Sequence, residues 1–434
     1  MRLLVAALCL VAIACSKPAH YYVRDLPAGM VELHEPIFVT GATELRGARQ
    51  GTALHMAPDF RGAAAVVIRG SNVWLHDFSI DGNRAALEIR QGLPPYDRTF
   101  AAFTANNGIA ATSVDTLDVD NVRFRNIAGF AILASRIARM NVSRVSVEDS
   151  GSRNAAGRNN TTGGILIEEG SADFSVANCT FRNILGSALW THSLYTSPRN
   201  ERGVFARNRI DAVGRDAIQV GHAKDMTVAD NLASHIGFPL DASDLEARAI
   251  PVGIDTAGNA EDAHYLDNRI AEINGKCMDL DGLHDSEIRG NVCVNRNPPA
   301  AYPLGNYAIV MNDTNPDMRT RNIRIVENRI ERPVFGAVFV IGESNIIARN
   351  ILLDLNTAHC NQNVAHYQCN YAAADPRILE AGVYLGRGAE RPAPARGNVV
   401  ENNLITGWGM KTGCVVAAPD IPTNWNIVRG NDCR

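Results

Sequence analysis

The sequence predicts an all-β solenoid, a parallel β-helix in which short strands stack coil upon coil. The first observation is a recurring phrase of Asn, apolar/polar alternation, Gly and a short apolar run; NRIDAVGRDAIQV, NRIAEINGKCMDL and NRIERPVFGAVFV are three copies. The second is period-2 alternation between these phrases, which is typical of strands. The third is the near absence of helical periodicity. One repeated unit cannot bury its apolar face alone, so neighbouring units must stack.

Alternating runs such as residues 142–147 and 323–326 are bounded by Gly, Asn, Asp and Pro, as strands are. We expect two or three short strands in each coil, and each coil about 4.8 Å above the last. Loop insertions account for the irregular intervals between phrases. A short surface helix is expected from Asp241 to Ala249.

The repeated polar residue has a structural explanation. Asn tolerates left-handed backbone angles at a tight bend, and its amide can hydrogen-bond to the Asn one coil away. We therefore expect a structural ladder rather than a catalytic group. Its expected members are Asp77, Asn121, Arg144, Asn178, Asn208, Asn231, Asn268, Asn291, Asn328, Asn350, Asn402 and Asn431.

Composition fits one long repeat domain. The chain has 434 residues, of which 46% are hydrophobic, enough for a continuous core. Charged residues make up 20% and the net charge is −4, which gives no reason to expect a nucleic acid partner. We expect a monomer.

The N-terminus predicts export. Residues 3–14 are apolar, too short a run to span a bilayer but right for a signal-peptide core. Cys15 directly follows the small-x-small site Ala12–Ala14, which resembles a bacterial lipoprotein signal with Cys15 lipidated; plain cleavage after Ala14 is the alternative. The predicted domains are a signal peptide (1–15), a linker and N-terminal cap lead-in (16–35) and the β-helix (36–434). The protein would then be periplasmic, an outer-membrane lipoprotein or secreted, and would contact a membrane only through the lipid anchor.

The cysteines fit an oxidising compartment. Two lie nine residues apart in a polar insertion, two bracket the C-terminal turn, and two flank one repeat. The expected pairs are Cys360 with Cys369, Cys414 with Cys433, and Cys277 with Cys293, which leaves Cys179 as a buried free thiol.

The repeat, with phrases such as NVWLHDFSIDGNR at Asn72 to Arg84, resembles the right-handed parallel β-helices of the pectin lyase-like superfamily from about Pro36 to Arg434. The resemblance implies a right-handed coil and a polysaccharide substrate. It does not fix the reaction, because the superfamily contains lyases, hydrolases, epimerases and non-catalytic binding proteins.

Stacking should place residues of equal phase in columns. The outward position after each apolar run reads Glu168, Thr191, Gly221, Asp255, Asp281, Asn312 and Ile341, followed by His192, His222, His284 and Asp313. Ionisable residues are thus restricted to the middle coils. A structural ladder would run the full length, so the restriction favours a site.

The richest stretch is CMDLDGLHDSEIRGN, residues 277–291. Asp279 and Asp281 should face the same way, roughly 6.6 Å apart along the strand, with Asp255 roughly 4.8 Å from Asp281 in the next coil. Carboxylates about 5–5.5 Å apart serve retaining glycosidases and about 6.5–9.5 Å inverting ones, and both are reachable. These three would supply the acid and its partner, and His222 or His284 the base. Glu168, His192, Tyr195, Lys224, Asn312 and Asp313 are the predicted substrate-binding residues.

Other interpretations remain. Asp beside Gly often makes an Asx turn, and single His residues are often surface hydrogen-bonders. The three carboxylates could instead hold Ca²⁺. Gly221-His222-Ala223 loosely resembles the Gly-His-Gly of polygalacturonase-like hydrolases, and Leu283-His284-Asp285 matches the end of the Asp-Pro-His-Asp of alginate epimerase-like proteins.

We therefore expect an exported carbohydrate-active enzyme that cleaves a polysaccharide in a groove over the middle coils. Hydrolysis, which requires no cofactor, is favoured over elimination because the site is rich in carboxylates. The alternatives are a Ca²⁺-assisted lyase or uronate epimerase, with Lys224, Arg215 or Arg153 to neutralise the uronate, and a non-catalytic glycan-binding surface protein.

Overall fold

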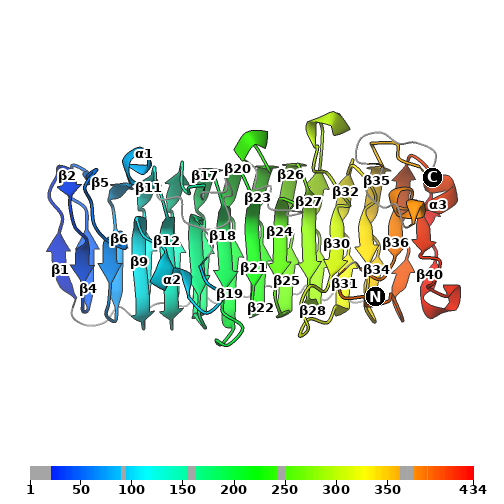
Figure 1. Ribbon diagram of the computed structural model, residues 1–434, viewed down its shortest axis with the longest axis horizontal. Helices are drawn as coiled ribbons and strands as arrows, with labels where there is room; N and C mark the ends of the chain where they lie inside the picture. Colours follow the sequence, from blue (N-terminus) through cyan, green and yellow to red (C-terminus); the bar gives the residue numbers. More distant parts are fainter. Residues whose placement is uncertain are drawn as a thin grey trace, which may run out of the picture.

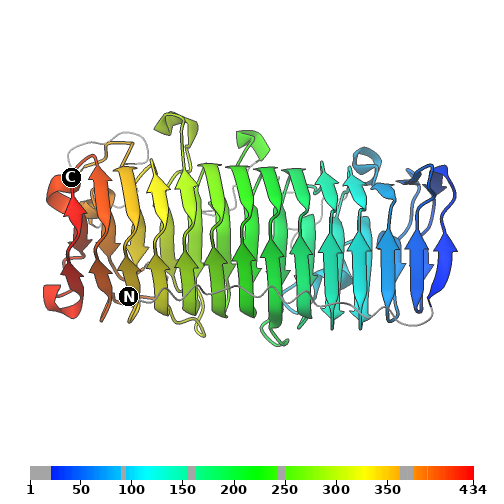
Figure 2. The ribbon, with the colours of Figure 1, turned by 180° about the vertical axis from the view of Figure 1, so that it is seen from behind.

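The computed structural model describes residues 21–88, 94–153, 162–242, 250–361, 369, 375–388 and 390–434. Its strands stack along one long axis (Figures 1 and 2) and form three sheets, here called A, B and C, in which every pair of neighbouring strands is parallel. Each coil contributes one strand to each sheet in turn. Stacking of coils, rather than pairing within a coil, therefore provides the backbone hydrogen bonds.

Sheet A contains β1 (Tyr22–Asp25), β4 (Thr43–Arg46), β7 (Val73–His76), β10 (Leu117–Asp120), β13 (Met140–Ser143), β16 (Ala172–Ala177), β19 (Asn200–Ala206), β22 (Ala223–Ala229), β25 (Ala260–Leu266), β28 (Leu283–Arg289), β31 (Arg321–Val326), β34 (Ile346–Ala348), β37 (Val399–Glu401) and β40 (Ile427–Arg429). Sheet B contains β2 (Gly29–Leu33), β5 (Thr52–Met56), β8 (Ser79–Asp81), β11 (Arg123–Arg125), β14 (Ser146–Glu148), β17 (Thr180–Ile184), β20 (Arg209–Val213), β23 (Leu232–Ile236), β26 (Arg269–Ile273), β29 (Val292–Val294), β32 (Arg329–Glu331), β35 (Ile351–Leu355), β38 (Leu404–Gly407) and β41 (Asp432–Cys433). Sheet C contains β3 (Ile37–Val39), β6 (Ala64–Ile68), β9 (Asn107–Val114), β12 (Phe130–Ile137), β15 (Gly163–Glu168), β18 (Ser187–His192), β21 (Asp216–Gly221), β24 (Val252–Ala257), β27 (Lys276–Asp281), β30 (Ile309–Asn312), β33 (Val338–Val340), β36 (Val383–Leu385) and β39 (Val415–Ala417).

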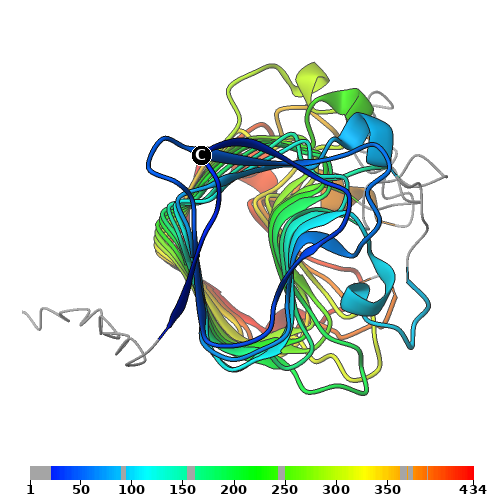
Figure 3. The same cartoon turned by 90° about the vertical axis from the view of Figure 1, so that its left-hand side faces the viewer.

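Several short helices lie outside the coil (Figure 3), whereas α3 (Met410–Gly413) contributes the buried Met410 to the core. The other short helices are α1 (Arg84–Leu87), α2 (Phe100–Phe103), η1 (Leu240–Ala242), η2 (Pro299–Ala301), η3 (Pro376–Leu379) and η4 (Thr423–Trp425). The helix expected from Asp241 overlaps η1, but residues 243–249 lie outside the described residues. None of the helices in the described ranges has the length and apolarity needed to cross a bilayer.

The inward residues of the three sheets form one continuous apolar core. Ile167, Val220 and Leu280 are fully buried along sheet C, and the same core runs from Leu26 to Met410. The coil begins earlier than the sequence predicts, because β1 and β2 already pair with the following coil. Part of the predicted lead-in therefore forms the first coil, while the predicted signal peptide and Cys15 lie outside the described residues.

The Asn ladder is real, but the sequence prediction merged two adjacent columns at the turn between sheets A and B. One column has positive φ and includes Asp77, Asn121, Arg144, Asn178 and Asn402. The hydrogen-bonded ladder is the next residue along: Asn208, Asn231, Asn268, Asn291, Asn328, Asn350, Asn403 and Asn431, with Cys179 in the same position one coil before Asn208. Left-handed geometry and amide stacking thus belong to neighbouring residues.

A substitution in the ladder should cost far more than one in the positive-φ column. Asn268 is fully buried; its Nδ2 donates to Val228 O and Asn291 Oδ1, and its Oδ1 accepts from Asn231. Asn268→Ala leaves these groups unsatisfied, so we expect a loss of about 3 kcal/mol or more, since each orphaned buried group costs about 1–3 kcal/mol. Urea unfolding measures the change. The control, Asn178→Gly at an exposed positive-φ site, should lose under about 0.5 kcal/mol; equal losses would contradict the separation of columns.

Three disulfides join Cys277 to Cys293, Cys360 to Cys369 and Cys414 to Cys433, the pairs that the sequence analysis anticipates. Cys179 is buried with a free thiol, whose pKa burial raises to about 12. Cys277–Cys293 lies in the middle coils, whereas the other two disulfides lie in the last part of the described solenoid. Each closes a short loop.

Candidate functional site

One outward column of sheet C changes from apolar to polar and back. In pairing order it reads Leu133, Leu166, Trp190, Gln219, Asp255, Asp279, Val310, Phe339 and Tyr384. Its apolar ends are covered, by Phe100 of α2 at the first end and by Leu379 and Tyr307 at the other. We call Gln219, Asp255, Asp279 and Asp281 the polar window.

The register corrects the alignment expected from sequence. Asp255 lies directly beside Asp279, whereas Asp281 lies beside Asn312. Thr191 is not outward: it is fully buried and pairs with Ile167 and Val220, so that His192 takes the place beside Glu168. Asp279 and Asp281 do flank buried Leu280, as the alternation predicts. The offsets arise because loops of different length separate the coils.

Asp279 holds an ion pair and an unused acceptor. Lys276, at the start of the same strand, donates to Asp279 Oδ2. Asp279 Oδ1 is buried and has no hydrogen-bond partner among the described residues. Asp279 therefore carries, on an outward-facing side chain, an acceptor atom that no described residue uses.

The surroundings of Asp255 favour its neutral form. Burial raises its pKa well above the ordinary range, and the carboxylates of Asp216 and Asp279 raise it further against the opposing charges of Arg215 and Lys276. Asp216 itself is engaged by Val252 N at 3.1 Å and by Arg215 Nε at 3.2 Å. Asp255 therefore binds a proton more readily than an ordinary carboxyl group, and with a proton on Asp255 it and Asp279 would share one negative charge.

Asp281 combines a raised pKa with a firm position. Thr314 donates to it twice, from N to Oδ1 at 3.0 Å and from Oγ1 to Oδ2 at 2.7 Å. Burial nevertheless raises its pKa to about 7, with a further contribution from the charge of Asp279. A carboxyl group with a pKa in this range can still carry a proton near neutral pH, the condition for a general acid.

An aromatic and histidine group borders the polar window. The rings of Tyr195 and His222 lie 4.4 Å apart, centre to centre, and His222 is 6.0 Å from His192. Burial lowers the pKa of His192 to about 4 and also lowers that of His222, so both are neutral. Burial raises the pKa of Tyr195, and the nearby charges of Asp317 and Asp281 raise it further. The Tyr195 ring is 59% exposed.

Several predicted residues lie elsewhere. His284 is in sheet A, where Asp285 and Asn259 engage its two ring nitrogens at 2.8 and 3.2 Å, so it is not a base for a substrate over sheet C. Lys224 is also in sheet A and pairs with Glu201 at 3.0 Å. Asp313 accepts from Thr320 N and Oγ1 and orders the loop after β30. The chain turns the corner between sheets at Gly282, which removes His284 from the site.

Buried polar atoms without partners gather on this face. Trp190 Nε1, His192 Nδ1, Gln219 Oε1 and Asp279 Oδ1 have no hydrogen-bond partner among the described residues. Such atoms are rare in folded proteins because each costs free energy. Their concentration on one outer face indicates a surface made to bind a polar ligand.

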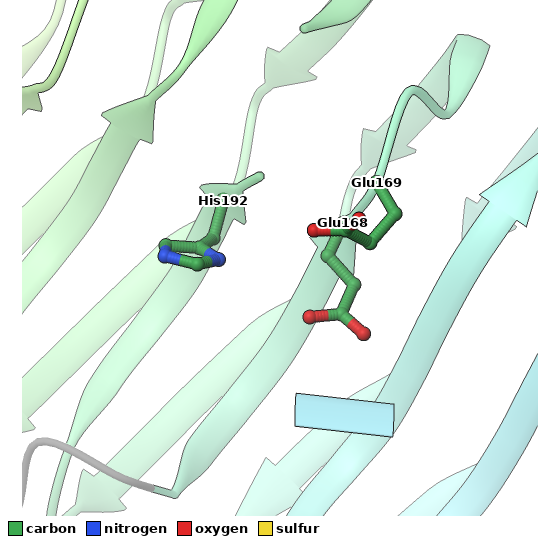
Figure 4. A group of neighbouring side chains, drawn as sticks. All are labelled: Glu168, Glu169 and His192. Atoms are coloured by element: carbon green, nitrogen blue, oxygen red, sulfur yellow. The ribbon is translucent and has the colours of Figure 1, made fainter. Parts of the chain in front are cut away.

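Within the described part of the chain, one group brings three potential metal-ligand atoms within 4.8 Å of one another: Glu168, Glu169 and His192 (Figure 4). Glu168 accepts from Phe100 N and Ala101 N at the start of α2, and Glu169 from Leu194 N, so both carboxylates already position loops. Asp255, Asp279 and Asp281 do not form such a group. The Ca²⁺ site at these three residues therefore stays a prediction.

Sequence reasoning missed Lys276, Gln219 and Thr314. Lys276 lies three residues before Asp279. In a strand this spacing does not predict a contact between the two side chains, unless the conformation at the start of the strand is known. Gln219 requires the register, and Thr314 approaches from a loop. Only coordinates could have found them.

The fold agrees with known proteins. Residues 64–264 match a family model described as right handed beta helix region. The match covers a little under half of the chain, and the three stacked parallel sheets show that the described chain as a whole is a parallel β-helix. This finding agrees with the resemblance to the pectin lyase-like superfamily. No curated protein matches the sequence.

Solved structures share this β-helix at low identity. A double mutant of the tailspike of E. coli bacteriophage HK620, in complex with a pentasaccharide, gives a TM-score of 0.58 at 11% identity over 92% of this chain and 71% of its own. PfbA, a surface adhesin of Streptococcus pneumoniae, gives 0.52 at 12% over 76% and 82%. The catalytic domain of a GH87 α-1,3-glucanase with nigerose gives 0.52 at 14% over 94% and 64%. At these identities the likeness shows the fold alone.

Proposed function

We propose that this β-helix protein is a glycoside hydrolase that cleaves a polysaccharide lying over the polar window of sheet C. The observation that carries the proposal is the window itself: acidic side chains with raised pKa beside buried, unpartnered polar atoms, bounded on both sides by covered apolar residues. Perturbed carboxyl groups concentrated at one place are typical of catalytic sites.

Asp281 and Asp279 take the two roles. Asp281, with its pKa near 7, donates a proton to the glycosidic oxygen as the C1–O bond breaks. Asp279 accepts the proton of the water whose oxygen bonds to C1. Their backbones are roughly 6.6 Å apart along the strand, and we expect their carboxyl groups to lie about 6.5–9.5 Å apart, the spacing of inverting enzymes. Neutral Asp255 is a positioning residue that keeps a single charge on its pair with Asp279.

Hydrolysis is favoured over elimination because, among the residues that the structure describes, both cations at the window are already paired with carboxylates. Lys276 pairs with Asp279, and Arg215 with Asp216. A uronate in the cleavage position would meet carboxylates without a group to neutralise it, as elimination requires. We therefore infer that the sugar at the cleaved bond is neutral.

Substrate binding extends from the window across the aromatic group. The exposed ring of Tyr195 can stack on a sugar, and the neutral imidazole of His222 beneath it fixes the angle of that ring. Structures of a tailspike with a pentasaccharide and a glucanase with nigerose support a glycan as the ligand of this fold. Export, with lipidation at Cys15 as one route, remains part of the proposal; the three disulfides support it because they suit an oxidising compartment.

The test is product analysis on a panel of neutral and mixed polysaccharides. We expect new reducing ends of inverted anomeric configuration, no ultraviolet-absorbing unsaturated product, and unchanged activity in EDTA. Loss of activity in EDTA together with an unsaturated product would establish the lyase alternative. Binding without any product would identify a glycan-binding surface protein instead.

A further inference from the structure

A second periodic surface lies on sheet B, away from the polar window. The Asn-Arg-Ile triplet of the repeated phrase recurs every 60 residues, with its Arg at 209, 269 and 329. On β20, β26 and β32 these arginines are exposed, and the intervening strands carry Leu232 and Val292 at the paired position. The column therefore alternates guanidinium and aliphatic side chains, one for each coil.

This surface is hollowed and basic. A groove of 540 Å³ is lined by Arg182, Arg209, Arg269 and Arg296, with Asp211 the one acidic residue among its lining. Arg209 and Arg269 are exposed, and neither side chain has a hydrogen bond or ion pair with any described residue. Leu232 between them is 38% exposed. The chain as a whole has a net charge of −4. Two arginines without an ion pair to a described residue are therefore a property of this surface and not of the overall composition.

We propose that this groove binds an acidic polysaccharide that carries one anionic group on every second sugar. Arg209 and Arg269 are two strands apart, roughly 9.6 Å, while one sugar of an extended polysaccharide is about as long as one strand spacing. A chain along the solenoid axis would thus present one anion to each Arg and the apolar face of the sugar between them to Leu232. Guanidinium groups bind carboxylates and sulfates through paired hydrogen bonds.

The lining disfavours other anionic partners. Its aromatic residue, Phe181, is fully buried, so the groove offers neither the stacking surface used for single-stranded nucleic acids nor the aromatic anchor common at protein interfaces. The proposal does not depend on cleavage at sheet C. It is compatible with it, because such a polymer has neutral sugars between the charged ones.

The experiment measures binding of hyaluronan oligosaccharides, which carry glucuronate on alternate sugars, by calorimetry at low salt. We expect the double variant Arg209→Gln, Arg269→Gln to bind at least tenfold more weakly, and added salt to weaken the wild type. The matched control, Arg324→Gln on sheet A, removes a charge elsewhere and should bind as the wild type does. Asp279→Asn protein is measured in parallel so that the oligosaccharide stays intact whether or not the protein is a hydrolase.

Three outcomes would overturn the proposal: hyaluronan does not bind the wild type, the double variant binds it normally, or DNA and polygalacturonate of matched length bind equally well. The last would show attraction to any polyanion rather than recognition of spacing. Unchanged circular dichroism and melting midpoint show that the double variant is folded. Leu232→Asp, which places a negative charge between the two arginines, should also abolish binding.

Discussion

Asp279→Asn is expected to lower kcat on the cleaved polysaccharide by 10²–10⁴-fold, the usual contribution of a general base. The asparagine keeps the size of the side chain but cannot accept the proton of the attacking water. Substrate affinity should change little, because Asp279 acts in the transition state. Initial rates of reducing-end formation, together with the dissociation constant of the intact polysaccharide, measure the two effects separately.

The control for this prediction is Asp262→Asn, which removes an exposed carboxylate from sheet A and should leave kcat unchanged. Asp281→Asn should be as damaging as Asp279→Asn. The double variant should lose little more than either single one, because groups that act together in one step are not additive. Full activity in the double variant would exclude this mechanism.

The pH profile should lose activity as the pH rises through about 7, because Asp281 must hold its proton to act as the acid. Thr314→Val removes the hydroxyl that donates to Asp281 Oδ2 and stabilises the ionised form. The pKa of Asp281 should then rise, and the alkaline limb of kcat/KM should move to higher pH. If the alkaline limb stays in place and the variant is as stable as the wild type, Asp281 is not the group whose ionisation controls activity.

The same ionisation affects stability in a predictable direction. The folded state holds the Asp281 proton up to about pH 7, whereas the unfolded chain releases it near 4. Between these values the unfolded state binds fewer protons, so the free energy of unfolding falls as the pH rises. Asp281→Asn should flatten this dependence. Compared with the wild type, the variant should therefore gain more stability at pH 8 than at pH 4. Urea midpoints of both proteins at the two pH values would measure the difference.

Much of the fold and part of the site follow from local sequence patterns. Alternation of period two is sufficient to place Asp279 and Asp281 on one face about a buried Leu280, because neighbouring strand residues point to opposite sides. The repeated phrase is sufficient for the stacked solenoid, because no single coil can bury its apolar face. The ladder itself was recognised, but the residue with left-handed geometry was not separated from the residue that forms the amide stack.

The sequence by itself therefore determined the parallel β-helix, its Asn ladder and the clustering of acidic residues in the middle coils, since these depend on spacing within a coil. Tertiary structure decided which residues meet between coils. Successive ladder positions are between 22 and 53 residues apart, and the sequence does not show which of the intervening residues form strands and which form loops. Register alone set Asp255 beside Asp279 and Gln219 beside Asp255, and the corner at Gly282 carried His284 into sheet A.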